Sequence, residues 1–174
     1  MLLYLDTNVI LARYAPEEPQ HLQAKKLLSK LEKGKLSAVT SVLTLVEVVC
    51  VTSRAYERFS DRELALGRED VAGNFLRRIA SSKLRFIPTG GEVSVNAAGR
   101  RIELPALFAL ALEIGSKTGV KTLDTLHLAS SIIASRIYGQ KIDCFVTLDE
   151  DILKRREEIS SLLESRVVSP AEAL

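Results

Sequence analysis

The feature that most constrains the fold of this chain is a series of short, mostly apolar runs. The first covers residues 2–5 and ends abruptly at Asp6, and comparable runs cover residues 36–40, 84–87 and 142–146. Runs of this length are too brief for helices and are typical of buried strands that are covered on both faces. We therefore expect strands at these four places.

Between these runs, apolar residues recur at the spacing of helices that bury one face. The alternation of strands and helices predicts an α/β fold with a mostly parallel sheet, and Val167-Val168 is a candidate edge strand. Asp61 is expected to cap a helix after a break at Ser60-Asp61. The expected helices cover residues 7–14, 20–33, 41–60, 61–82, 105–117 and 122–138, with a short one from Asp149.

At residues 92–104 the spacing of apolar residues changes from that of a helix to the alternation that is typical of strands. Val93 and Val95 alternate with polar residues, and the stretch 96–99 has the composition of a turn, after which Ile102 and Leu104 alternate again. Two alternating segments around such a turn predict a β-hairpin.

Two further expectations concern burial. Cys50 and Cys144 lie in apolar runs and are expected to be buried free thiols rather than partners in a disulfide. A shared buried face is expected for four leucines of the helix at 20–33, which are Leu22, Leu27, Leu28 and Leu31.

Length and composition narrow the classes of protein to which this chain can belong. The length of 174 residues suits a single domain over residues 1–174, and a net charge of +2 excludes a polycation that binds nucleic acid along its whole surface. Tryptophan is absent, so a base-stacking platform is poorly supplied. No run approaches the roughly 18 apolar residues that span a bilayer, and we expect a cytoplasmic protein that makes no contact with membranes.

Acidic residues gather after the predicted strands. Asp6 directly follows the first strand and Asp149 follows the strand at 142–146, while Glu47 and Asp124 lie in helices that come after other strands. The carboxyl ends of parallel strands share one edge of a sheet, where ligands bind in such folds. All four carboxylates are therefore expected at one edge, whereas Asp143 opens its strand and belongs to the opposite edge.

Each of these acids has an alternative interpretation. Asp6, Asp124 and Asp149 are also suited to helix N-termini, whose dipole favours negative charge. Glu47 is harder to explain in this way, because valines and leucines flank it and no Lys or Arg lies within four residues. Its burial costs several kcal/mol unless it is paired or binds a metal. His127, three residues after Asp124, is interpreted as a core or capping histidine rather than as a metal ligand.

Four carboxylates in one place would repel one another strongly if all were ionised. A hard divalent cation with oxygen ligands, Mg²⁺ or Mn²⁺, relieves this repulsion. Such a cation lowers the pKa of a bound water and holds a phosphate oxygen, which is the chemistry of nucleases that use no covalent nucleophile.

Four ordered motifs in this chain resemble those of PIN domains. They are LDTNVI at 5–10, the Glu that ends SVLTLVE at 41–47, LDTLHLA at 123–129 and FVTLD at 145–149. The resemblance covers residues 2 to about 155 and implies a three-layer α/β/α fold, from which the hairpin at 92–104 departs as an insertion. It also implies a Mg²⁺- or Mn²⁺-dependent endoribonuclease similar to the VapC-type toxins of toxin–antitoxin pairs.

The same resemblance implies roles for particular residues and partners. Asn8 and Thr147 would orient the metal ligands. Proteins of this type are generally homodimers, and a small antitoxin protein blocks their activity on RNA. The apolar stretches at 105–117 and 122–138 are candidates for the dimer interface. The implied catalytic metal ligands are Asp6, Glu47, Asp124 and Asp149, and Asp151 is either a second contributor beside Asp149 or a solvent-facing residue.

Two other functions remain open from the sequence alone. One is a catalytically silent module that binds RNA or protein. The other is a phosphatase or phospho-acceptor domain, which Asn8 disfavours because that chemistry usually wants a second acid two residues after Asp6. Six basic residues are either contacts for an RNA backbone or ordinary surface charges. They are Arg13, Arg100, Arg101, Lys154, Arg155 and Arg156.

Overall fold

The computed structural model describes residues 1–59 and 67–174. None of the helices within these two ranges is long and apolar enough to cross a membrane. The elements follow one another along the chain as β1 (Leu2–Leu5), α1 (Thr7–Ala12), α2 (His21–Glu32), β2 (Ser37–Ser41), α3 (Leu43–Arg54), α4 (Tyr56–Phe59), α5 (Arg68–Ala80), β3 (Arg85–Ile87), β4 (Glu92–Ala97), β5 (Arg100–Pro105), α6 (Ala106–Thr118), α7 (Thr122–Arg136), β6 (Cys144–Val146), α8 (Glu150–Lys154), α9 (Arg156–Leu163) and β7 (Arg166–Val168).

A five-stranded parallel sheet forms the centre of the molecule, with the strand order β3-β2-β1-β6-β7. β1 lies in the middle, where Leu3 is in register with Ala38 of β2 and with Cys144 of β6. The four strands expected from the apolar runs are all present. The candidate at Val167-Val168 is confirmed as part of β7, which pairs with β6 at one edge.

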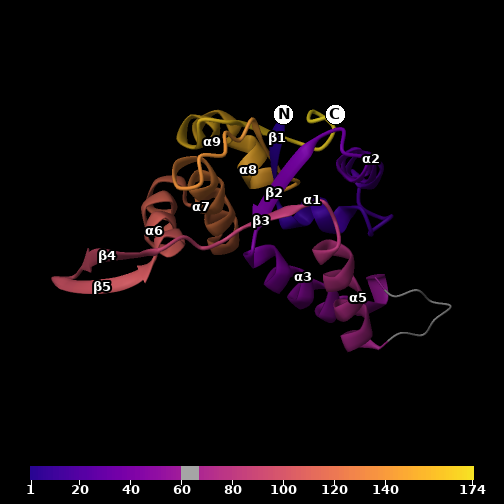
Figure 1. The fold of residues 1–174 in the computed structure, drawn as a ribbon, viewed down its shortest axis with the longest axis horizontal. Coiled ribbons are helices and arrows are strands. Elements are labelled where there is room, and N and C mark those ends of the chain that lie inside the picture. The colour runs from indigo at the N-terminus through magenta and orange to yellow at the C-terminus, as the bar shows by residue number, and fades with distance from the viewer. Residues whose placement is uncertain (60–66) are drawn as a thin grey trace.

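The alternation of side chains along β1 explains the layers. Leu3 and Leu5 point to one face of the sheet and join a core with residues of α1, α2, α3 and α5. Tyr4 points to the other face and joins a second core with residues of α6, α7, α8 and α9. Successive side chains of a strand face opposite sides, so one short strand contributes to both cores. Figure 1 shows helices on both sides of the sheet, which is the expected three-layer α/β/α arrangement.

The expected hairpin is present as an antiparallel pair of strands, β4 and β5. Its two-residue turn consists of Ala98 and Gly99, both with positive φ. Positive φ at both positions is the conformation of a type I′ turn, whose twist matches that of the flanking strands. The hairpin follows β3, leads into α6, and projects from the body of the molecule (Figure 1).

Some expectations about helices and burial need correction. The helix expected at 41–60 begins at Leu43 and ends at Arg54, and α4 follows as a separate short helix. Cys50 is exposed, because Thr44, Val48 and Thr52 form the buried stripe of α3 and leave the neighbouring apolar positions outside it. Cys144 is buried, as expected. The expected break at Ser60-Asp61 and the cap at Asp61 lie outside the described residues.

Leu22 does not share the buried face of α2, since its exposed fraction is 72%. It lies five positions before Leu27, which rotates it by about 140° around the helix at 3.6 residues per turn. Leu27, Leu28 and Leu31 are buried as expected, together with Ala24.

These two leucines of α2 provide a matched test of the packing. Leu27→Ala removes a fully buried side chain and should lower the free energy of unfolding by about 2–5 kcal/mol. Leu22→Ala on the same helix should change it by less than about 0.5 kcal/mol. Urea unfolding followed by circular dichroism measures both, and equal effects would contradict the observed orientation of α2.

Candidate functional site

Asp6 lies where β1 ends, at the carboxyl edge of the sheet. Its backbone N–H donates to the carbonyl of Val146 at the end of β6, at 3.0 Å. Its side chain is almost completely buried, and Oδ2 accepts hydrogen bonds from Asn8 Nδ2 at 2.8 Å and from Thr147 Oγ1 at 2.7 Å. Burial raises the pKa of Asp6, although the charge of His127 and the hydrogen bond from Thr147 oppose that rise. Two neighbours thus fix the direction of this carboxylate.

Glu47 reaches the same edge from α3, which begins immediately after β2. Its Oε2 lies 3.0 Å from His127 Nε2, and that nitrogen lies 3.9 Å from Asp6 Oδ1. One ligand atom from each of Asp6, Glu47 and His127 falls within 4.8 Å of the other two. Burial raises the pKa of Glu47, but hydrogen bonds with His127 and Thr7 outweigh it and leave that pKa below its usual value.

Asp124 lies in the first turn of α7, three residues before His127 and beside this group. Burial raises its pKa to about 6, and the negative charges of Asp6 and Asp149 add to the rise. The carboxylates therefore affect one another as expected for a shared edge, although Asp124 and Asp149 are not within the tight group that Asp6, Glu47 and His127 form.

Asp149 follows β6 and caps α8. Its Oδ1 accepts hydrogen bonds from the backbone N–H groups of Asp151 at 2.8 Å and Ile152 at 3.1 Å. The capping interpretation is therefore correct for one oxygen of this residue, while Oδ2 lies 3.5 Å from Lys121 Nζ. Asp151 is exposed and lies 3.6 Å from the same Lys121 nitrogen.

Asp143 lies at the opposite edge, as expected. Its carboxylate accepts a hydrogen bond from the backbone N–H of Leu2 at the start of β1, at 2.6 Å. This places it one strand length from the site acids, and we assign it no part in the site.

Sequence reasoning underestimated two residues of this edge. His127 is buried, as a core histidine should be, but its Nε2 faces Glu47 and Asp6. The Asp-x-x-His spacing was the signal, because residues three apart share a helix face. Lys121, just before α7, contacts Asp149 and Asp151, and no local pattern marks it.

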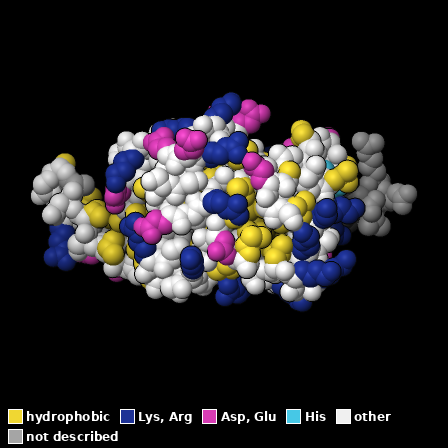
Figure 2. Space-filling model, turned by 90° about the horizontal axis from the view of Figure 1, so that it is seen from above, with side chains coloured by type: hydrophobic (Ala, Val, Ile, Leu, Met, Phe, Trp, Pro, Cys, Tyr) yellow, Lys and Arg dark blue, Asp and Glu magenta, His cyan; other side chains and the backbone are white. Residues whose placement is uncertain are grey.

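Most of the basic residues considered for RNA binding form ion pairs elsewhere on the surface. Figure 2 shows Lys and Arg side chains among Asp and Glu over the middle of the face in view, and Lys and Arg with few acidic neighbours near its right end. Arg100 is exposed on the hairpin. The pairs are Arg13–Glu32 at 2.5 Å, Arg101–Glu103 at 2.9 Å, Lys154–Glu150 at 3.2 Å, Arg155–Glu158 at 2.9 Å and Arg156–Glu172 at 2.8 Å.

A pocket of about 360 Å³ adjoins the acids, and Asn8, Glu47 and Asp149 form part of its wall. Apolar side chains from α1 and α3, among them Leu11 and Val51, complete much of the lining. Its size and mixed lining are those of a ligand pocket.

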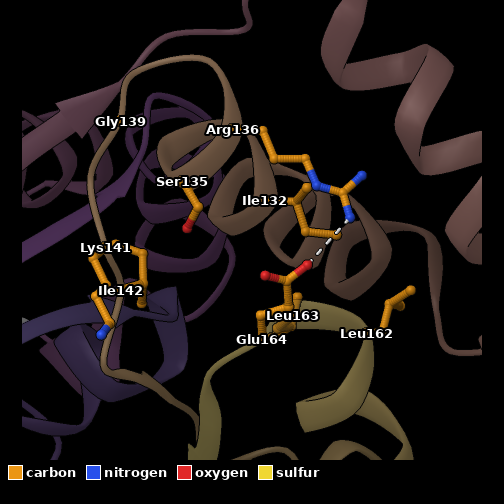
Figure 3. Close-up of a pocket in the computed structure, with 9 residues that line it drawn as sticks. All are labelled: Ile132, Ser135, Arg136, Gly139, Lys141, Ile142, Leu162, Leu163 and Glu164. Atoms are coloured by element: carbon orange, nitrogen blue, oxygen red, sulfur yellow. Dashed lines mark ion pairs between the residues drawn. The ribbon is translucent and has the colours of Figure 1, made fainter.

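Another pocket, of about 310 Å³, lies away from the acids, between the loop that precedes β6 and the end of α9. Figure 3 shows Arg136 and Glu164 facing each other across it, with 3.8 Å between their charged atoms. None of the expected site residues lines this pocket.

Comparison with known proteins places the chain in a family. It resembles VapBC2 from Rickettsia felis, solved bound to a DNA fragment from their promoter, with 15% identity over 97% of this chain and 98% of that one and a TM-score of 0.54. It also resembles VapC20 of Mycobacterium tuberculosis, a sarcin-ricin loop cleaving toxin, with 18% identity over 87% and 93% and a TM-score of 0.55.

At these identities the likeness to solved structures shows a shared fold. A comparison with curated protein sequences found no significant match. The sequence model of the PIN domain matches residues 3–159, which is most of the chain. The protein therefore belongs to the PIN domain family.

Proposed function

We propose that this protein is a divalent-metal-dependent endoribonuclease of the VapC type. The observation that carries the proposal is that Asp6 and Glu47, which come from separate elements, each bring a ligand atom within 4.8 Å of the other and of His127 at the carboxyl edge of the sheet. Asp124 lies close enough to the same group for its pKa to be raised. Membership of a family of nucleases and the fold shared with VapC20 support the reaction and an RNA substrate.

The residues at this edge suit a hard divalent cation. The pKa of Asp124 is raised by burial and by the charges of Asp6 and Asp149, so negative charge is crowded here without full compensation. Carboxylate oxygens are the ligands that Mg²⁺ and Mn²⁺ prefer. We propose that Asp6, Glu47, Asp124 and Asp149 hold the cation. When bound, it supplies a lowered pKa for a coordinated water and compensation for phosphate charge.

The surrounding residues have separate tasks in this proposal. Asn8 and Thr147 both bind Oδ2 of Asp6, which leaves Oδ1 directed towards Glu47 and His127. A carboxylate that is already oriented loses less entropy when it binds a cation. Lys121 projects beside Asp149, with a side chain that is 71% exposed, and its ammonium group is placed to meet a phosphate of the RNA.

The proposed partners follow from the same relationship. We propose that the protein acts in the cytoplasm as the toxin of a toxin–antitoxin pair and that a small antitoxin protein restrains it. The likeness to VapBC2 and VapC20 supports this assignment. We also propose a homodimer in which exposed apolar side chains of α6 are buried.

Removal of one carboxylate tests the site directly. Asp6→Asn should lower the rate of RNA cleavage by about 100-fold or more, since loss of even a group that orients a ligand costs about 10- to 100-fold. Asp151→Asn should leave the rate within about twofold, because Asp151 is exposed and its contact is with Lys121. Cleavage of a labelled RNA with Mg²⁺ or Mn²⁺ measures both variants.

Unchanged cleavage by Asp6→Asn would remove the proposed mechanism. No cleavage by the unaltered protein under any of these conditions would favour a catalytically silent module. A large loss in Asp151→Asn would show that Asp151 belongs to the site.

The crowding of negative charge around Asp124 predicts that Asp124→Asn is more stable than the unaltered protein when no divalent ion is present. The size of this gain should depend on pH. The pKa of Asp124 is raised from 3.8 to about 6 in the folded protein, so the folded state holds this proton more tightly than the unfolded chain. Stability therefore falls as pH rises from about 4 through about 6. Asparagine carries no charge, and the variant should avoid that fall.

We expect Asp124→Asn to melt a few degrees above the unaltered protein at pH 8 with EDTA, since about 1 kcal/mol shifts the Tm of a chain of this size by about 2–4 °C. The difference should shrink to about a third of that size at pH 4.5, which lies between the two pKa values. Thermal melts at both pH values measure it, and a gain of equal size at pH 4.5 would show that charge is not its cause.

Substitutions on the exposed side of α6 test the proposed homodimer. Phe108 and Leu112 are exposed on this helix, with exposed fractions of 42% and 65%. The double variant Phe108→Glu, Leu112→Glu should be monomeric by light scattering at a concentration where the unaltered protein is dimeric. Leu22→Glu, on the exposed side of α2, should remain dimeric. A monomeric unaltered protein at high concentration would refute the dimer.

A further inference from the structure

His127 is bound on both sides of its ring, by Tyr4 and Thr7, which are buried, and by Glu47, which is half-buried. Its Nδ1 lies 2.9 Å from the hydroxyl of Tyr4, and its Nε2 lies 3.0 Å from Glu47 Oε2 and 3.2 Å from Thr7 Oγ1. Tyr4 is fully buried and His127 is 1% exposed, so neither has bulk water as an alternative partner. A buried imidazole with both nitrogens engaged is held in one orientation.

The hydrogen bonds decide which nitrogen faces Glu47 as a donor. The single hydroxyl proton of Thr7 is donated to an oxygen, either Thr44 Oγ1 at 3.1 Å or the Glu47 carboxylate, and none is left for His127. An ionised Glu47 carboxylate offers only acceptors. The two oxygens beside Nε2, Thr7 Oγ1 and Glu47 Oε2, can therefore only accept a hydrogen bond from it, so Nε2 must carry a proton. The Tyr4 hydroxyl then faces Nδ1, where it donates to a neutral ring or accepts from a charged one.

From this geometry we infer that His127 is a positioning residue for Glu47. Its Nε2–H fixes Oε2 and leaves the other oxygen of Glu47 free for the cation, and Tyr4 fixes the ring. His127 does not itself ligate the cation in this arrangement, although it lies within reach. The inference deepens the proposed function and rests on it.

Tyr4 links this arrangement to the sheet. It lies on β1 two residues before Asp6, and its ring stacks on Phe145 of β6 with 5.1 Å between centroids and 9° between planes. The central strand thus supplies Asp6 directly and orients Glu47 through Tyr4 and His127. Glu47 has a long side chain with 22% exposure, so without this bond it would sample other rotamers.

Two substitutions of His127 by amide side chains distinguish the role of its Nε2 from that of its Nδ1. The amide nitrogen of His127→Gln reaches the position of Nε2 and can donate to Glu47, whereas that of His127→Asn stops near Nδ1 and can meet only Tyr4. We expect His127→Gln to bind Mn²⁺ within about threefold of the unaltered protein. His127→Asn should bind it about 10- to 100-fold more weakly. Isothermal titration with Mn²⁺ alone measures these affinities without reference to catalysis.

A second variant probes the outer contact. Tyr4→Phe removes one oxygen and should weaken Mn²⁺ binding by about 2- to 10-fold, the usual worth of one hydrogen bond. It also serves if His127→Asn fails to fold, which circular dichroism would reveal. His21→Asn removes the other histidine of the chain, on α2, and should leave the affinity unchanged.

Electron spin-echo spectroscopy of bound Mn²⁺ separates positioning from ligation. The absence of a ¹⁴N coupling of a directly bound imidazole is expected, and its presence would overturn the inference. Equal Mn²⁺ affinity in His127→Gln and His127→Asn would also overturn it. The proposed function fails separately, if the unaltered protein binds no Mn²⁺ and Asp6→Asn makes no difference.

Discussion

The position of Asp6 depends on the pairing of β1 with a strand on each side. β2 and β6 hold it in register, and Asp6 continues that pairing through its N–H bond to Val146. A carboxylate at the end of a central strand is buried by its neighbours, so its oxygens must find partners in the protein. Asn8 and Thr147 supply them for Oδ2, and Oδ1 lies 3.9 Å from His127 Nε2.

The buried polar groups beneath the acids form a connected network rather than isolated bonds. Thr7, Thr44 and Thr40 bind one another in sequence, and Thr40 donates to the carbonyl of Leu5. Such networks are costly if one member is unpaired and rigid if all are satisfied. This network lies against His127, so the orientation of His127 is anchored in the core.

The fold was largely predictable because its signals are local. A short apolar run followed by an acid, as at Leu5-Asp6, marks a buried strand and its end without knowledge of any neighbour. Errors arose where burial depends on rotation about a helix axis. Leu22 and Cys50 are apolar or nearly so, yet each lies outside the buried stripe of its helix. Periodicity over a few residues does not define that stripe sharply, because the packing of the helix decides it.

The amino-acid sequence by itself determined that acids follow strands and that Glu47 needs a partner. Only the tertiary structure decided that this partner is His127, 80 residues away, and that Tyr4 holds its ring. It also decided that Asp149 divides its oxygens between a helix cap and Lys121. The reason is physical: strand ends are encoded by neighbouring residues, whereas hydrogen-bond partners are chosen in space by packing that no local pattern records.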